Sequence, residues 1–386
     1  MYNKSLTFTA ACMGMAFVGI SFIVIGSVLP ALTAKYGLNE SDVSYTVTFL
    51  PIGVLIGSLI FGPVADRFGY RILLAGSTLI AAAGFMGISL INYAEALPYS
   101  IFLIGLGSGM LNGSTNSLVS GIYDNKKRSA RLGILGACYG IGALSMPTLL
   151  GILSRHYSYE SILLSTGIFM TLSVIYFMAI RFPAPLKSKG ISFKQLFLLF
   201  KQPVTVILSL FLFFQSGIEG LLNNWTAIFL NKTNGIEVGR SVFILTSFVM
   251  GMTVARLLLG SLLKHWKPLH TLTAGLFMTA IGLTGLYYTS GMVMTAAISL
   301  FICGFGLSAG FPVMIGIIGS LHKEMMGTAI GFALFIALTG NSILNYLMRY
   351  VILLSGMKSF PLFLALLTVA QAIIILKNKK IINSNF

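Results

Sequence analysis

The stretch GPVADRFGYR, Gly62 to Arg71, is a polar break between two apolar runs of the sequence. The first run covers residues 43–65 and the second covers residues 71–92. An α-helix needs about 20 mainly apolar residues to cross a bilayer, and each run has that length. The stretch therefore predicts a short loop between two membrane-spanning helices.

The same pattern recurs along the whole chain. Its 386 residues are 56% hydrophobic and only 9% charged, and the mean hydropathy is +0.92, far from the averages of soluble domains. Strands of a membrane barrel would alternate apolar and polar residues, whereas these runs are apolar on all sides. We predict an all-α membrane protein whose twelve transmembrane helices cover residues 6–32, 43–65, 71–92, 98–122, 131–153, 160–181, 203–230, 241–263, 269–289, 292–320, 326–348 and 359–376.

The longest break between spans is basic and contains three prolines, from Arg181 to Pro203. It divides the chain into an N-terminal six-helix bundle (1–182), a cytoplasmic linker (183–202) and a C-terminal six-helix bundle (203–386). The halves show a weak internal repeat: GPVADRFGYR has a degraded counterpart in GMTVARLLLGSLLKHW, and GLGSGMLNGSTN resembles GFGLSAGFPVMIG. A duplicated six-helix unit is typical of secondary transporters, with the substrate site near the midplane between the halves.

The net charge of +16 fits a membrane orientation. With the N-terminus inside, most of the 25 Lys and Arg residues fall on the cytoplasmic side, as the positive-inside rule requires. No aromatic and basic patch accompanies them, so we expect no nucleic-acid partner. We expect a multi-pass monomer of the cell inner membrane with both termini in the cytoplasm, whose partners are the lipid bilayer and a small-molecule substrate.

The polar break resembles a known family motif. Gly62, Asp66, Arg67, Gly69 and Arg71 are similar to the loop between the second and third helices of the major facilitator superfamily. The resemblance implies the major facilitator fold of two pseudo-symmetric six-helix bundles, in which this loop is a gating motif that helps to lock the cytoplasmic side. The residues agree with that role, because glycine permits close packing and a tight turn and a carboxylate suits a helix N-terminus.

A second stretch, FFQSGIEGLLNNWTAIFL, resembles the seventh helix of the fucose, galactose and glucose proton symporter family, through Gly217, Glu219 and Trp225. The stretch GLGSGMLNGSTNSLVSGIY looks like the fourth helix of that family, with Asn112 and Asn116 at its polar positions. This resemblance implies proton-coupled sugar transport.

Glu219 lies deep in a predicted span, about 16 residues after Pro203, or roughly 24 Å along a helix. An ionisable group at that depth is costly unless it faces a cavity or a partner, so we interpret Glu219 as the proton-coupling residue. Gln215 and Asn223 lie four residues on either side and share its helix face, which we expect to line a cavity. A structural hydrogen-bond cluster, with Trp225 as an interface anchor, is the alternative.

Two further amide pairs have the same spacing. Asn112 and Asn116 share one face of the predicted fourth helix, and Asn341 and Asn345 share one face of the eleventh. Amides both donate and accept hydrogen bonds, which suits neutral polyols, although amides also join membrane helices to each other. The predicted substrate-binding residues are Asn112, Asn116, Gln215, Asn223, Asn224, Trp225 and Asn341. We expect Asn112, Asn116 and Asn341 to meet in one polar cavity between the halves.

These residues favour a proton-coupled secondary transporter of a small neutral polar solute, a sugar or polyol. A proton-driven exporter of drugs or amphiphilic metabolites is the alternative, because the gating motif is shared and many Phe and Met residues would suit a permissive pocket. A receptor or scaffold with a transporter fold is disfavoured by the intact motif and the buried carboxylate. We expect no enzyme activity, because no nucleophile and base combination is present, and no metal site or cofactor, with the proton as coupling ion.

Overall fold

The computed structural model describes residues 2–38, 40–154, 156–184, 199–289 and 291–384, and these residues form helices without any strand. The α-helices are α1 (Lys4–Tyr36), α2 (Glu40–Leu90), α3 (Leu97–Ile122), α4 (Asn125–Leu153), α5 (Tyr159–Ala179), α7 (Pro203–Asn234), α8 (Val238–His265), α9 (Pro268–Tyr287), α10 (Val293–Leu307), α11 (Gly310–Leu321), α12 (Met326–Ser355), α13 (Phe360–Lys377) and α14 (Lys379–Ser384). Short 3₁₀ turns cover Ala94–Ala96, Lys323–Met325 and Met357–Ser359.

The described helices account for all twelve predicted spans, so the predicted architecture is confirmed. Ten helical segments are long and apolar enough to cross a membrane, and a shorter apolar segment covers Ile244–Leu259 in α8. The count differs because α2 contains the second and third spans in one 51-residue helix. α10 and α11 together form the tenth span.

The predicted loop at GPVADRFGYR is a break at one residue. Gly69 has φ 79° and ψ 169°, which interrupts α2, while the residues on both sides stay helical. A residue with a Cβ rarely adopts a positive φ of this size, so glycine is needed at this position. The polar residues therefore extend the helices almost to the break.

The chain forms two compact units, and α4 and α12 contribute residues to both of them. Unit 1 is Met1–Ile122, Cys138–Phe197 and His322–Phe332; unit 2 is Tyr123–Ala137, Leu198–Leu321 and Ala333–Phe386. Most of the predicted linker, residues 185–198, lies outside the described residues. The domain boundary at residues 183–202 stays a prediction.

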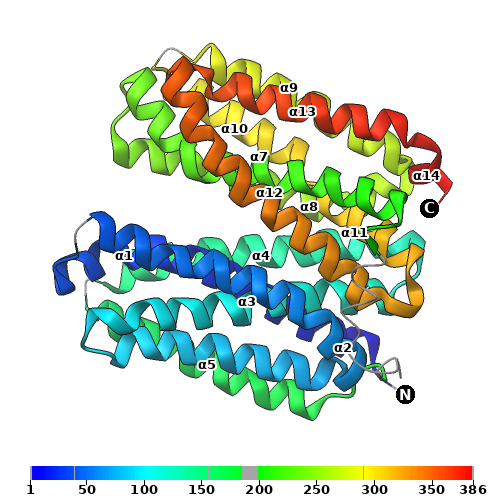
Figure 1. Ribbon diagram of the computed structural model, residues 1–386, viewed down its shortest axis with the longest axis horizontal. Coiled ribbons are helices and arrows are strands. Elements are labelled where there is room, and N and C mark those ends of the chain that lie inside the picture. Colours follow the sequence, from blue (N-terminus) through cyan, green and yellow to red (C-terminus); the bar gives the residue numbers. More distant parts are fainter. Residues whose placement is uncertain (1, 39, 155, 185–198, 290, 385–386) are drawn as a thin grey trace. The chain divides into compact units, whose positions relative to one another are not determined.

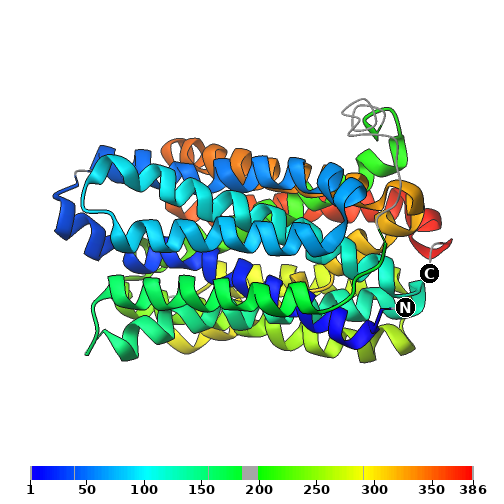
Figure 2. The same cartoon turned by 90° about the horizontal axis from the view of Figure 1, so that it is seen from below.

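In unit 1, α2 packs against α3 and α5, and Figure 2 shows α2 (blue) beside α3 (cyan). The α2–α3 contact depends on glycines that are spaced four residues apart on each of the two helices. A Cβ added at Gly53 would lie 2.4 Å from the carbonyl oxygen of Phe102, and one added at Gly109 would lie 2.3 Å from that of Val54. Small residues at this spacing allow two helix backbones to approach closely in a membrane.

In unit 2, α8 packs against α10 in the same way, and α9 lies beside both α10 and α13 (Figure 1). A Cβ added at Gly251 of α8 would lie 2.2 Å from the carbonyl oxygen of Phe301, and one at Gly304 of α10 would lie 2.0 Å from that of Phe248. These helices are the eighth and tenth predicted spans, and α2 and α3 contain the second and fourth. The two units thus share the same kind of close helix contact, although Gly62 of the repeated stretch itself faces Thr328 of α12.

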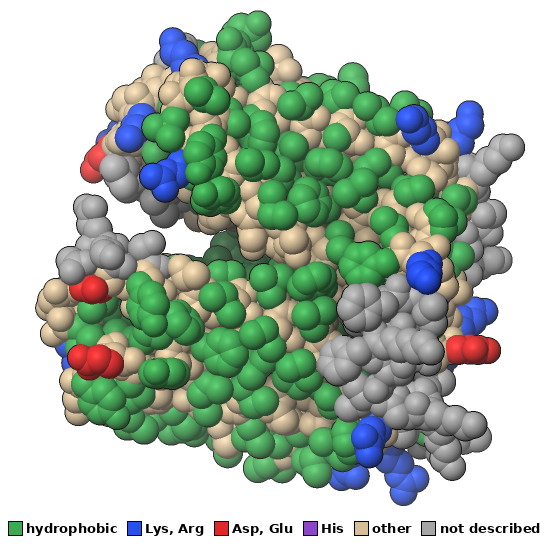
Figure 3. Space-filling model, in the orientation of Figure 1, with side chains coloured by type: hydrophobic (Ala, Val, Ile, Leu, Met, Phe, Trp, Pro, Cys, Tyr) green, Lys and Arg blue, Asp and Glu red, His purple; other side chains and the backbone are tan. Residues whose placement is uncertain are grey.

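The outer faces of the helices are apolar. Figure 3 shows hydrophobic side chains along the sides of each unit, with Lys and Arg gathered near the helix ends. Phe169 is 59% exposed, Phe277 is 68% exposed and Leu366 is 63% exposed. In water such surfaces would be unfavourable, whereas in a bilayer they face acyl chains of the same polarity.

Candidate proton and substrate site

Glu219 lies near the middle of α7, and its side chain is partly buried. Gln215, one turn earlier, is 1% exposed and donates from Nε2 to Oε1 of Glu219 over 2.7 Å. Asn223, one turn later, is exposed and donates from Nδ2 to the backbone oxygen of Glu219 over 2.8 Å. The three side chains therefore follow one face of α7 in the order that helical spacing predicts.

The Gln215 carboxamide has all its hydrogen-bonding groups occupied. Its Nε2 also donates to the carbonyl oxygen of Leu307, the last residue of α10, over 2.8 Å. Its Oε1 accepts from Nε2 of Gln371 on α13 over 2.9 Å. Gly310, the first residue of α11, makes room for this group, since an added Cβ would lie 2.4 Å from Oε1. Gln215 thus connects Glu219 to the break between α10 and α11.

Gln371 is a site residue that the sequence analysis missed. It is fully buried, and it fixes which way the Gln215 amide points, because both N–H groups of Gln215 are already used. The signal in the sequence is a single amide in the apolar run from Phe360 to Lys377. A buried amide in a spanning helix requires a partner, and only the fold shows that this partner is Gln215.

Arg256 of α8 is a buried cation with few hydrogen bonds. It is 6% exposed, and its Nη1 donates to the carbonyl oxygen of Gly136 on α4 over 3.3 Å. Its Nε has no hydrogen-bond partner among the described residues. A Cβ added at Gly136 would lie 2.9 Å from the Arg256 side chain, so glycine provides the space for the guanidinium. Arg256 attracts the Glu219 carboxylate electrostatically, but the described residues place no ion pair between them within 4 Å.

A second group of amides joins α7 to α12. Oδ1 of Asn345 accepts from Nδ2 of Asn224 over 3.0 Å and from Nε1 of Trp225 over 3.1 Å. Its Nδ2 donates to Oδ1 of Asn341 over 2.8 Å. α7 and α12 are closely packed at this network, and glycine is needed there. A Cβ added at Gly220 of α7 would lie 2.2 Å from Oδ1 of Asn341 on α12. Asn345 is thus the centre of this network.

Asn112 and Asn116 of α3 form the matching pair in unit 1. Nδ2 of Asn116 donates to Oδ1 of Asn112 over 3.0 Å and to its backbone oxygen over 2.8 Å. Both side chains are partly buried. They belong to unit 1 while Asn341 belongs to unit 2, so their convergence on one cavity stays a prediction.

Two residues of the predicted gating motif, Gly62 and Asp66, contact the start of α12 within unit 1. Asp66 is 7% exposed, and its Oδ2 accepts from the hydroxyl of Thr328, in the first turn of α12, over 2.9 Å. A carboxylate at a helix N-terminus is favoured by the unpaired N–H groups and the helix dipole. Gly62 allows this approach, because an added Cβ would lie 2.9 Å from the Cα of Thr328.

The two arginines of the motif have different surroundings. Arg67 is exposed and lies over the ring of Phe68, with 5.2 Å between the guanidinium carbon and the ring centroid. Arg71 donates to the backbone oxygen of Met178, near the end of α5. The motif therefore contacts α5 and α12 through two different side chains.

We expect Asp66→Asn and Thr328→Val each to slow transport at saturating solute by about tenfold, since a hydrogen bond to a charged group contributes about 1.5–3 kcal/mol. Equilibrium affinity for the solute should change by no more than about threefold, because the pair lies far from a midplane site. Initial uptake rates and binding isotherms measure the two effects. Thr339→Val is the matched control on α12, where the hydroxyl donates only to Phe335 of its own helix. Full-rate transport by both variants, or loss of binding in folded protein, would contradict the assignment.

The described residues contain no group of three or more His, Cys, Asp and Glu side chains that could hold a metal ion. The expectation that the protein uses no metal or cofactor stays a prediction.

Comparisons with known proteins agree with this architecture. Residues 11–344 match the Major Facilitator Superfamily. The uncharacterized MFS-type transporter YfkL of Bacillus subtilis is 24% identical over 324 residues, which are 82% of this chain and 81% of that protein. The 4-hydroxybenzoate transporter PcaK of Acinetobacter baylyi is 23% identical over 337 residues, which cover 77% of this chain and 73% of that protein.

Solved structures share the fold at low sequence identity. The outward conformation of the transporter FucP superposes with a TM-score of 0.78 at 17% identity, covering 95% of this chain and 97% of FucP. The proton:xylose symporter XylE superposes with a TM-score of 0.81 at 16% identity, covering 97% of this chain and 96% of XylE. The chain belongs to the Major Facilitator Superfamily and is a multi-pass membrane transporter, not an enzyme.

Proposed function

We propose that this transporter moves a small neutral polar solute, a sugar or polyol, together with protons by alternating access. Glu219 carries the coupling proton. Asn112, Asn116, Asn223, Asn224, Trp225 and Asn341 contact the solute. Gln215, which the sequence predicts as a substrate-binding residue, positions the Glu219 carboxyl instead, because its amide is buried and bonded to Glu219, Leu307 and Gln371. Both termini lie in the cytoplasm, in accord with the distribution of Lys and Arg.

The observation that carries the proposal is the carboxyl of Glu219 at the middle of α7, held by Gln215. A carboxyl group in a spanning helix is costly, and such groups commonly belong to proton pathways. Its one side-chain donor, Gln215, is neutral, so the carboxyl is not neutralised by an ion pair among the described residues. Proton binding and release therefore remain available to it.

The polar groups around Glu219 support a neutral solute. The exposed amides of Asn223 and Asn224 each have hydrogen-bonding capacity beyond the one hydrogen bond that each donates to a described residue. XylE is described as a proton:xylose symporter and E. coli FucP as a fucose:proton symporter. Their similar fold supports sugar and proton symport by analogy.

An organic acid anion is the second candidate, because Arg256 is buried and its Nε has no hydrogen-bond partner in the part of the chain that the structure describes. A guanidinium binds a carboxylate through two parallel hydrogen bonds, which would satisfy this group. The relative PcaK is named as a 4-hydroxybenzoate transporter, and another relative, from Pseudomonas putida, as a gallate transporter. Arg256→Gln separates the candidates, since it should weaken binding of an aromatic acid strongly and binding of a sugar little.

Thermal-shift measurements on the purified protein test the solute class. The panel is fucose, xylose, a linear polyol, 4-hydroxybenzoate, gallate and a cationic drug. A solute that binds only the folded state at about 100 times its dissociation constant stabilises it by about 2.7 kcal/mol, which is readily detected. Stabilisation by a sugar or polyol is the expected result. Stabilisation by the drug or by the aromatic acids alone would overturn the neutral-solute proposal.

A further inference from the structure

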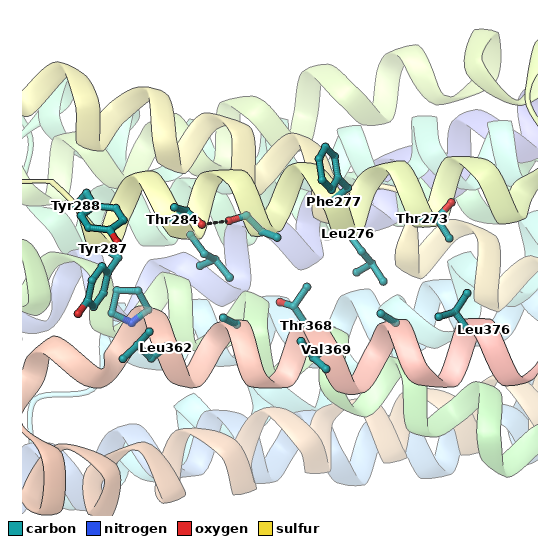
Figure 4. Close-up of a pocket in the computed structure, with 15 residues that line it drawn as sticks. Thr273, Leu276, Phe277, Thr284, Tyr287, Tyr288, Leu362, Thr368, Val369 and Leu376 are labelled. Atoms are coloured by element: carbon teal, nitrogen blue, oxygen red, sulfur yellow. Dashed lines mark hydrogen bonds between the residues drawn. The ribbon is translucent and has the colours of Figure 1, made fainter.

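The surface of unit 2 contains a long groove between α9 and α13 (Figure 4). Its volume is about 690 Å³, within the range of about 300–1,000 Å³ that is usual for ligand sites. Thr273 and Leu376 lie at one end, and Tyr287, Tyr288 and Leu362 lie at the other. Leu362 and Leu376 are fourteen residues apart on α13, which is about 21 Å along a helix.

The wall of the groove is mainly apolar along its length. Its three threonine hydroxyls all donate to carbonyl oxygens of their own helices: Thr273 to Leu269, Thr284 to Ala280 and Thr368 to Leu364. Tyr287 and Tyr288 add two phenol hydroxyls at one end of the groove, and the remaining lining is aliphatic or aromatic, with Phe277 68% exposed. A flexible hydrocarbon chain is the ligand that such a surface accepts. One leaflet contributes about 15 Å to the hydrocarbon core of the bilayer, and the groove is longer than that. The groove therefore has room for a whole acyl chain.

The end of the groove at Thr273 and Leu376 is rich in basic side chains, of which the lysines carry the positive charge. His270 is exposed one turn before Thr273, and Lys267 is exposed at the N-cap of α9. Lys377 follows Leu376 directly, and Lys379 begins α14, which packs against α9. The sequence has no Asp or Glu between Glu237 and Glu324 or from residue 325 to 386, so no acidic side chain of these segments neutralises the cluster.

The charge and the groove together define one amphipathic ligand. We propose that the groove binds one anionic phospholipid, with an acyl chain between α9 and α13 and its phosphate against Lys267, His270, Lys377 and Lys379. Basic clusters at the cytoplasmic ends of spanning helices attract anionic lipid headgroups, and a zwitterionic lipid lacks the net charge for this attraction. The exposed ring of Trp266, next to Lys267, suits the level of the headgroups. This site is separate from Glu219 and does not depend on the solute.

Native mass spectrometry of the full chain in detergent tests the proposal, with phosphatidylglycerol and phosphatidylcholine as probes. We expect one phosphatidylglycerol per chain with at least about tenfold preference over phosphatidylcholine, where tenfold corresponds to about 1.4 kcal/mol. The triple variant Lys267→Gln, Lys377→Gln, Lys379→Gln should bind the two lipids equally. Ala372→Trp, which fills the groove, should remove the bound lipid while leaving the charge unchanged.

The matched control is Lys232→Gln with Lys358→Gln, which removes two positive charges near the opposite ends of helices in the same unit. This control should keep the preference for phosphatidylglycerol. Melting temperature and gel filtration establish that each variant is folded. Equal binding of both lipids by the native protein would overturn the proposal, as would an unchanged preference in the triple variant. A lipid-free dimer that forms through the groove, and is broken by Ala372→Trp, would also overturn it.

Discussion

Glu219→Gln is expected to abolish solute accumulation driven by a pH gradient while leaving solute binding within about threefold of the native protein. Glutamine resembles the protonated carboxyl in shape and hydrogen bonding, but it cannot release a proton. Gln215 should still donate to the new carbonyl oxygen as it does to Glu219. The variant should therefore carry solute down its own gradient and exchange it, without concentrating it.

Uptake into proteoliposomes, with and without an imposed pH gradient, measures this effect. We expect at least a tenfold loss of gradient-driven accumulation. Glu237→Gln is the matched control, because that side chain is 76% exposed, pairs with the exposed Arg240 and lies just before α8. Accumulation by Glu219→Gln equal to that of the native protein would make Glu219 a structural residue.

Gln371→Leu is expected to change the pH dependence of transport more than it changes folding. The substitution leaves Oε1 of Gln215 buried without its donor, at a cost of about 1–3 kcal/mol. It also removes Oε1 of Gln371, which is itself buried without a partner among the described residues, so the net cost should fall near the lower end. The Gln215 amide is then no longer held, and its hydrogen bond to Glu219 weakens.

The pH of half-maximal uptake should rise by about one unit in this variant, because a hydrogen bond to a carboxylate favours the ionised form and one unit corresponds to about 1.4 kcal/mol. The charged group that also acts on Glu219 is Arg256 of α8, which the substitution leaves in place. Gln202→Leu is the control, since Gln202 is exposed just before α7. An unchanged pH profile in folded Gln371→Leu protein would show that Gln371 does not position the carboxyl.

Much of the fold could be predicted from the sequence, because a membrane helix is identified by the length of its own apolar run. Residues elsewhere in the chain are not needed to identify it. The twelve spans follow from that rule. The sequence predicts the position of the break in α2 correctly, at GPVADRFGYR. Polarity alone does not predict that the break is a single non-helical residue and not a loop. Polar residues such as Asp66 and Arg67 indicate a loop, whereas they extend the helix and leave Gly69 as its interruption.

The candidate site could be predicted only in part. Helical spacing relates Gln215 to Glu219 and Asn341 to Asn345, because these contacts lie within one helix. Contacts between helices depend on the register of packing, which the sequence does not specify. The bond from Gln371 to Gln215 and the bonds from Asn224 and Trp225 to Asn345 belong to this second class.

The coupling of solute and proton movement through Glu219 is tested most directly by recording the internal pH of proteoliposomes when solute is added outside. No gradient is imposed, a pH-sensitive dye is enclosed, and fucose, xylose and 4-hydroxybenzoate are added in turn. The proposal predicts that fucose or xylose acidifies the interior with the native protein, and that Glu219→Gln gives no acidification although labelled sugar still equilibrates. Sugar uptake by the native protein without a pH change, or equal acidification with Glu219→Gln, would contradict it.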